Sequence, residues 1–209
     1  MAVDSSGYVY VAESWGGLIQ KFDSSGNFIL QWGVAGAEDV AVDSDGYVYV
    51  TNYSNSVKKY DSSGNFILQW GSEGIGDGQF NRPEGIAVDA SGNIYVVDSF
   101  NRRIQKFDSS GNFILKWGSY GTGDGQFSVP MDVAVDASGN IYVVEHMDYQ
   151  YNDRIQKFNS SGNFILKWGS WGTGDGQFKA PIGVAVDASG NIYVSDAWNY
   201  CVKKFGMSP

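Results

Sequence analysis

The side chains best suited to chemistry in this 209-residue chain are carboxylates and aromatic rings, beside one histidine, His146, and one cysteine, Cys201. A single imidazole and a single thiol exclude multi-histidine centres, internal disulfides and cysteine-based metal clusters. Catalysis would therefore depend on carboxylates, and binding on aromatic rings. The net charge of −9 disfavours nucleic-acid phosphates and anionic membranes as partners.

Carboxylates recur at one place in a repeated pattern, the end of a short apolar run. They are Glu13, Asp98, Glu145 and Asp196, with Asn52 in the remaining copy. There a carboxylate can accept hydrogen bonds from loop amides or pair with Arg103 and Arg154. A catalytic centre needs different groups on different copies, and the later copies are too alike to supply them. We therefore expect no enzyme and no cofactor.

Two further aspartates, Asp39 and Asp132, begin short apolar runs, where Gly85 and Gly183 stand in other copies. A hard cation such as Ca²⁺ prefers oxygen ligands of this kind. These aspartates are therefore the candidates for a metal site, although we expect none to be present.

One copy gains residues between Glu145 and Ile155, and the added segment holds His146, Tyr149 and Tyr151. Exposed tyrosines give contact area at little entropic cost, so the segment is a candidate recognition loop. The alternative is a tolerated surface insertion.

Aromatic rings recur two residues after the strand-end carboxylates, and others lie on the connections between copies. The first set is Trp15, Phe100 and Trp198, and the second is Tyr120 and Trp171. Together they form a candidate platform for a sugar or a peptide. The alternative is that they pack between repeats, because residues that recur in register usually share a structural role.

The elements that must position these residues come from a repeat. The phrase Val-Asp-x-x-Gly occurs with its aspartate at Asp4, Asp43, Asp89, Asp136 and Asp187. In the third copy, short β-branched and aromatic runs over 85–88, 94–97, 103–107 and 112–117 predict four strands. Asp-Ser-Ser-Gly at 108–111 predicts a tight turn. Helical periodicity is lacking.

Four consecutive antiparallel strands in a unit of about 40–50 residues are typical of a propeller blade. Each such sheet is apolar on both faces and must stack on neighbours around an axis. A long link, 118–131, leads to the next blade, with Phe127 as the expected plug and Pro130 as the strand start. The links and the loops between second and third strands share one rim, called the link rim below.

The unit resembles the NHL repeat of six-bladed β-propellers. The motifs that carry the resemblance are Gly-Asp-Gly-Gln-Phe, Pro-x-Gly-Ile-Ala-Val-Asp, Gly-Asn-Ile-Tyr-Val-Val-Asp and Asn-Arg-Arg-Ile-Gln-Lys-Phe. The resemblance implies an all-β propeller, and this chain encodes five four-stranded units, the fifth with three strands. We expect one domain over 1–209, with units over 1–38, 39–82, 83–129, 130–180 and 181–209.

Ring closure has two outcomes. Five blades can close at about 72° each, which is our prediction. Alternatively they keep six-fold spacing and expose two apolar blade faces, which would drive self-association through the unclosed fifth blade.

The function expected is a non-enzymatic binding or scaffold module whose partner, a protein, a peptide or a small ligand, lies on the link rim. The near-identity of the later units also fits recent duplication or construction without an evolved ligand. One alternative is a carbohydrate or small-molecule binder on the aromatic, acidic rim. Another is a metal-dependent lyase or lactonase, as in related propellers.

Some NHL propellers bind single-stranded RNA, but acidic residues outnumber basic ones on this rim, so we expect no nucleic acid. No apolar run of about 18 residues is present, so we expect no membrane span.

Overall fold

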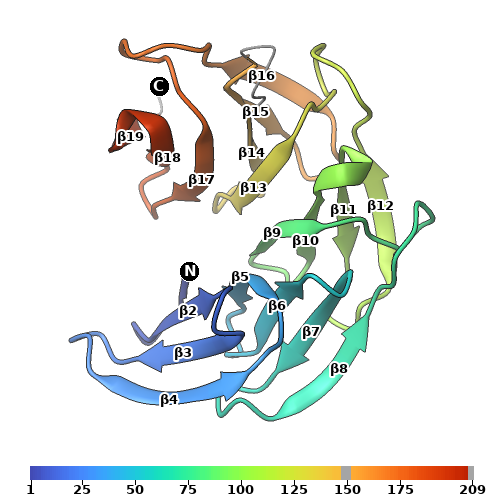
Figure 1. Ribbon diagram of the computed structural model, residues 1–209, viewed down its shortest axis with the longest axis vertical. Helices are drawn as coiled ribbons and strands as arrows, with labels where there is room; N and C mark the ends of the chain where they lie inside the picture. The colour runs from blue at the N-terminus through green and yellow to red at the C-terminus, as the bar shows by residue number, and fades with distance from the viewer. Residues whose placement is uncertain (147–151, 207–209) are drawn as a thin grey trace.

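The computed structural model describes residues 1–146 and 152–206, which form five antiparallel sheets arranged around an axis (Figure 1). Four sheets have four strands and the last has three. In every sheet the strands pair in chain order, with the first strand nearest the axis and the last at the periphery. The all-β propeller with a three-stranded fifth blade is therefore confirmed.

The strands of the first two blades are β1 (Ala2–Val3), β2 (Val9–Glu13), β3 (Leu18–Phe22), β4 (Phe28–Gly33), β5 (Ala37–Val42), β6 (Val48–Asn52), β7 (Ser56–Tyr60) and β8 (Phe66–Trp70). The third and fourth blades contain β9 (Pro83–Val88), β10 (Ile94–Asp98), β11 (Arg103–Phe107), β12 (Phe113–Trp117), β13 (Pro130–Val135), β14 (Ile141–Glu145), β15 (Arg154–Phe158) and β16 (Phe164–Trp168). The fifth blade contains β17 (Pro181–Val186), β18 (Ile192–Asp196) and β19 (Cys201–Phe205). Two single-turn 3₁₀ helices, η1 (Ser99–Asn101) and η2 (Ala197–Asn199), occupy the loops between the second and third strands of the third and fifth blades.

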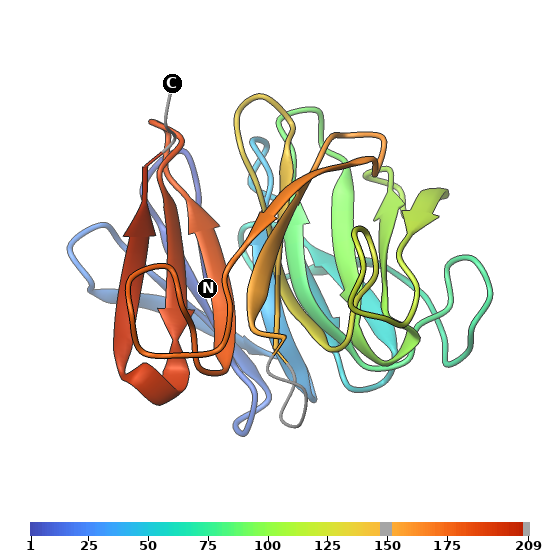
Figure 2. The same cartoon turned by 90° about the horizontal axis from the view of Figure 1, so that it is seen from above.

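Aspartates close the hairpin turns on the rim opposite the link rim; both rims are visible in Figure 2. Asp89 Oδ1 accepts hydrogen bonds from the backbone amides of Ser91 and Asn93, each at 2.9 Å. Gly92 follows at a φ of +78°, a left-handed conformation that favours glycine. These local bonds explain why Val-Asp-x-x-Gly marks the same turn in every blade.

The links dock through buried phenylalanines. Phe80, Phe127 and Phe178 are fully buried, and Pro83, Pro130 and Pro181 are the first residues of the innermost strands that follow. Both parts of the prediction for the links are confirmed.

Apolar clusters between neighbouring blades form the core. Between the third and fourth blades, Tyr95, Val97 and Ile104 pack against Val143 and Phe158. The equivalent clusters join the first blade to the second, the second to the third, and the fourth to the fifth. Stacking of sheets that are apolar on both faces therefore holds the described part of the chain together.

The ring is open between the first and fifth blades, so the predicted closure at five blades is wrong. Within residues 1–146 and 152–206, no apolar cluster joins these two blades, and their strands lie apart (Figure 1). Val202 of β19 is 67% exposed, whereas its equivalents Ile104 and Ile155 are fully buried by the next blade. The five blades therefore form an arc in which similar apolar clusters repeat from one blade to the next without closing the circle.

None of the helical segments in the described ranges is long and apolar enough to cross a membrane.

Candidate functional site

The strand-end carboxylates clamp the links. Asp98 is fully buried at the end of β10, where its Oδ2 lies 2.7 Å from Arg103 Nε and its Oδ1 accepts the Asn81 amide at 2.7 Å. Arg103 in turn donates to the carbonyl oxygens of Ile75, Gly76 and Gln79, each at 2.8 Å. Burial raises the pKa of Asp98, and the amide and guanidinium donors oppose that rise.

Glu145 has the same role in the fourth blade. Its carboxylate is fully buried, lies 2.6 Å from Arg154 Nε and accepts the Ser128 amide at 2.7 Å and Gln156 Nε2 at 2.9 Å. Burial raises the pKa of Glu145, and the interaction with Arg154 opposes that rise without cancelling it. Glu145 is thus engaged within the protein on both oxygens, and its environment is that of a structural ion pair.

The clamp varies in the other blades. In the fifth blade, Lys203 Nζ lies 3.3 Å from Asp196 and donates to the carbonyl oxygens of Gly174 and Gln177. In the second blade, Asn52 bonds Ser56 instead. The predicted pairing with arginines and loop amides is confirmed for Asp98 and Glu145, and Asp196 is also fully buried. Glu13 of the first blade differs: it is exposed, and its Oε2 accepts a hydrogen bond from Gln20 Nε2 at 3.4 Å.

The predicted aromatic residues lie on the surface of the link rim. Trp15 is fully exposed, Trp198 is 60% exposed, and Phe100, Tyr120 and Trp171 are also exposed. These five rings are exposed and lie outside the apolar clusters between blades, which argues against the alternative that they pack between repeats. Whether they bind a ligand stays a prediction.

Cationic side chains cover several of these rings. Arg82 lies 5.1 Å from the Phe100 ring centre, and Arg102 lies 5.8 Å from both Phe100 and Tyr120. Lys179 lies 4.9 Å from Trp171. Such pairs orient the rings and leave their edges to solvent.

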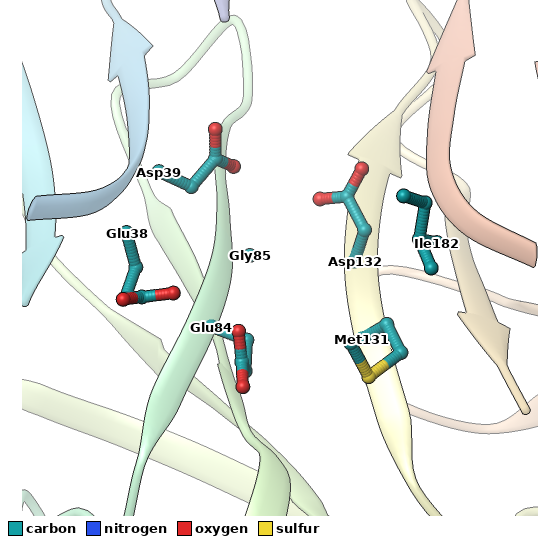
Figure 3. Close-up of a pocket in the computed structure, with 7 residues that line it drawn as sticks. All are labelled: Glu38, Asp39, Glu84, Gly85, Met131, Asp132 and Ile182. Carbon is teal, nitrogen blue, oxygen red and sulfur yellow. The ribbon is translucent and has the colours of Figure 1, made fainter. Parts of the chain in front are cut away.

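An acidic hollow of about 280 Å³ lies on the axis where the innermost strands begin, at the link rim (Figure 3). This axial hollow is lined by Glu38, Asp39, Glu84, Gly85, Met131, Asp132 and Ile182. The four carboxylates come from β5, β9 and β13 and project into the shared space. The structure therefore brings together the two predicted aspartates and adds two glutamates.

Both aspartates tie one blade to the next. Asp39 Oδ2 accepts the Ile86 amide at 3.1 Å, and Asp132 Oδ2 accepts the Val184 amide at 2.8 Å. A Cβ on Gly85 would lie 2.4 Å from Asp132 Oδ1, so the carboxylate needs glycine beside it. The alternation of aspartate and glycine in the sequence follows from this crowding at the axis.

The axial carboxylates have unequal electrostatic surroundings. Asp39 Oδ1 lies 3.0 Å from the Met1 ammonium, and Glu84 lies 2.6 Å from Arg82 Nε. Burial and the nearby Asp39 charge raise the pKa of Asp132 to about 7. Burial also raises the pKa of Glu84. One Glu38 oxygen is buried without a hydrogen-bond partner among the described residues.

The two remaining predicted features are the candidate recognition loop and the metal site. Tyr149 and Tyr151 of the candidate recognition loop lie outside the described residues, while the His146 amide donates to the Val129 carbonyl oxygen at 3.2 Å. In the described part of the chain, no three acidic, histidine or cysteine side chains are placed to hold a metal ion together.

Sequence reasoning missed Glu38 and Glu84. Each occupies the second position of its innermost strand, next to Asp39 or Gly85. The same position in other blades holds Met131 and Ile182, so comparing this column across the units would have marked the acidic side of the hollow.

Comparison with known families agrees with this architecture. A family model for the NHL repeat matches residues 80–107 and 178–205. These two segments are NHL repeats. Each NHL segment runs from a buried link phenylalanine through the third strand of its blade, β9 to β11 in one case and β17 to β19 in the other.

Solved structures share the fold of this chain at low identity. Hydrazine synthase from Kuenenia stuttgartiensis gives a TM-score of 0.70 at 15% identity, over 99% of this chain and 75% of that one. Virginiamycin B lyase from Staphylococcus aureus gives a TM-score of 0.66 at 13% identity, over 99% of this chain and 69% of that one. A protein of unknown function from Bacteroides caccae gives a TM-score of 0.69 at 13% identity, over 96% of this chain and 69% of that one. These likenesses show the propeller fold alone, and the comparison with curated proteins gives no match.

Proposed function

We propose that this NHL propeller is a non-enzymatic binding module that takes a protein or peptide partner on its link rim. A basic side chain of the partner would enter the axial hollow, and apolar side chains would lie on the surrounding aromatic rings. The observation that carries the proposal is the cluster of four carboxylates, Glu38, Asp39, Glu84 and Asp132, in one open hollow.

Charge in the hollow favours a cation. Met1 pairs with Asp39 and Arg82 pairs with Glu84, whereas Glu38 and Asp132 have no ion pair within the described ranges. Burial and the Asp39 charge raise the pKa of Asp132, and a guanidinium or ammonium group in the hollow would stabilise its ionised form. The chain's net charge of −9 would also speed the approach of a basic partner.

The exposed rim rings support a peptide partner. Trp15 and Trp198 lie on the link rim of the two blades that flank the opening, and both are highly exposed. Rigid aromatic side chains of this kind are enriched at protein interfaces. The carbohydrate alternative has less support, because Arg82 and Arg102 lie over Phe100 and Lys179 lies over Trp171.

The clamps support a non-enzymatic role. Asp98 and Glu145, two of the recurring strand-end carboxylates, are fully buried and hydrogen-bonded to arginine and backbone amides. A general acid or base must reach the substrate proton, and these side chains hold links instead.

Titration with hexa-arginine, followed by calorimetry at low salt, tests the proposal. We expect saturable binding that weakens about fivefold or more in the double variant Glu84→Gln, Asp132→Asn. Glu73→Gln removes a charge from an exposed link residue on the same rim and is the matched control. Equal weakening in both variants, or equal binding of hexaglutamate, would contradict a basic partner at the axis.

A further inference from the structure

A second hollow, of about 390 Å³, lies between the fourth and fifth blades, away from the axis. This edge hollow is lined by Tyr142, Lys157, Leu166, Trp168, Ile192, Phe205 and Gly206. It is mainly apolar and borders β16, the outer strand of the fourth blade, and β19, the last strand of the fifth.

In the earlier blades a phenylalanine of the outer strand fills this position. Phe158 of β15 contacts Phe164 of β16 with ring centres 6.1 Å apart, and Phe164 packs on the cluster that contains Trp117. The turn before β16 closes the same place, because a Cβ on Gly162 would lie 2.8 Å from the Trp117 ring. Each blade thus covers the tryptophan of the blade before it with its own outer hairpin.

The fifth blade lacks that cover in the described part of the chain. No described strand pairs with the outer edge of β19. Phe205 is half-buried, whereas its equivalents Phe107 and Phe158 are fully buried. Leu166 is 45% exposed, while its equivalent Leu115 is half-buried. The blade presents both an unpaired strand edge and an apolar hollow shaped by the missing neighbour.

We propose that β19 and the edge hollow accept an extended strand from a second polypeptide with the pattern Asn-Phe-Ile-Leu-Gln-Trp. The strand would pair antiparallel with β19 and place its phenylalanine beside Phe205, in the edge hollow. The occupant follows from continuity with the four complete blades, in each of which a strand of this pattern, Phe66–Trp70 for example, pairs with the third strand.

The pairing register selects the partner's residues. In the second blade, Lys58 lies opposite Gln69, Lys59 opposite Leu68, and Tyr60 opposite Phe66. Applied to β19, this register places a glutamine opposite Lys203 and a leucine opposite Lys204. Glutamine avoids the like-charge pair that a lysine would create, so the second-blade sequence is the better donor. The site lies at the outer edge and is independent of the axial hollow.

The test uses a fluorescently labelled peptide with the sequence of residues 61–71, Asp-Ser-Ser-Gly-Asn-Phe-Ile-Leu-Gln-Trp-Gly, and the full chain. We expect saturable binding by fluorescence anisotropy, and loss of binding when the peptide phenylalanine is replaced by aspartate. N-methylation of the alternate peptide amides that face β19 removes the hydrogen-bond donors and should abolish binding. N-methylation of the intervening amides, which face away from β19, should leave binding unchanged.

Two variants of the protein give a matched control. Leu166→Asp puts a charge into the edge hollow and should weaken binding about tenfold or more, whereas Ile165→Asp alters its equally exposed neighbour on the opposite face of β16 and should leave binding unchanged. Circular dichroism checks that both variants fold. Either of two results overturns the proposal: no saturation, or equal binding to both variants.

Discussion

At the residue scale, the outer-strand tryptophans join neighbouring blades. Trp117 ends β12, and its ring lies 5.8 Å from that of Phe158 on the next blade and against the backbone of Gly162. Trp32 of the first blade and Trp70 of the second blade make the same contacts, with Tyr60 and Phe107 respectively. A single large side chain therefore contributes to two blades at once.

Replacing Trp117 by alanine should lower the free energy of unfolding by about 3–5 kcal/mol, since it opens a cavity between two sheets. Urea denaturation measures the change. Trp15→Ala is the control, because that ring is fully exposed on the link rim and its removal should change stability by less than about 0.5 kcal/mol. Similar losses in both variants would contradict the packing role of Trp117.

Asp132 should make stability depend on pH. Its folded-state pKa of about 7 lies above the ordinary value of about 3.9. Between about pH 4 and pH 7 the folded chain therefore binds a proton that the unfolded chain has released, so the free energy of unfolding falls as pH rises through this window.

Urea denaturation at several pH values tests this expectation. Asp132→Asn should remove the downward slope and be the more stable form at pH 8, by about 1 kcal/mol or more. Parallel pH profiles for the two proteins would show that Asp132 is ionised throughout in the folded state.

At the element scale, the three links that lead into the third, fourth and fifth blades are each held by a basic side chain of the third strand: Arg103, Arg154 or Lys203. Replacing Arg103 by methionine leaves the Asp98 carboxylate buried without its ion pair and removes the donors for three link carbonyls. We expect a loss of about 3–5 kcal/mol and faster proteolysis within residues 73–82. Arg102→Met, which alters a half-buried neighbour outside the clamp, should preserve both stability and protease resistance. Unchanged cleavage in the Arg103 variant would count against the clamp.

Local patterns made the elements predictable. The Asp-x-x-Gly turns and the β-branched runs are short-range signals, and the strands, the turns and the buried Phe127 were all predicted from them. The pairing of strand-end carboxylates with arginines was also predicted, because both lie next to one loop. The axial role of Glu38 and Glu84 was not, since it depends on which strands meet at the axis.

At the scale of the whole molecule, the angle between blades could not be predicted from the pattern within a blade. It results from the packing of each cluster, such as Val143 and Phe158 against Tyr95, repeated at every step. The resulting arc exposes residues of the fifth blade that match buried ones elsewhere.

Self-association through the open faces should follow from this exposure. Sedimentation velocity at increasing protein concentration should show oligomers that decrease when Val202, 67% exposed on β19, is replaced by arginine. Strict monomers at all concentrations would mean that the exposed faces do not associate under those conditions.

The open ring is tested most directly by placing the same charge at equivalent positions on two blades. Val202→Arg should change the free energy of unfolding by less than about 0.5 kcal/mol, because its side chain already faces solvent. Ile155→Arg, at the equivalent position buried between the fourth and fifth blades, should cost several kcal/mol, roughly 3–5. Urea denaturation of both variants gives the answer: a large difference is the result predicted by the open arc, and equal, large losses would mean that the first blade covers Val202 in a closed ring.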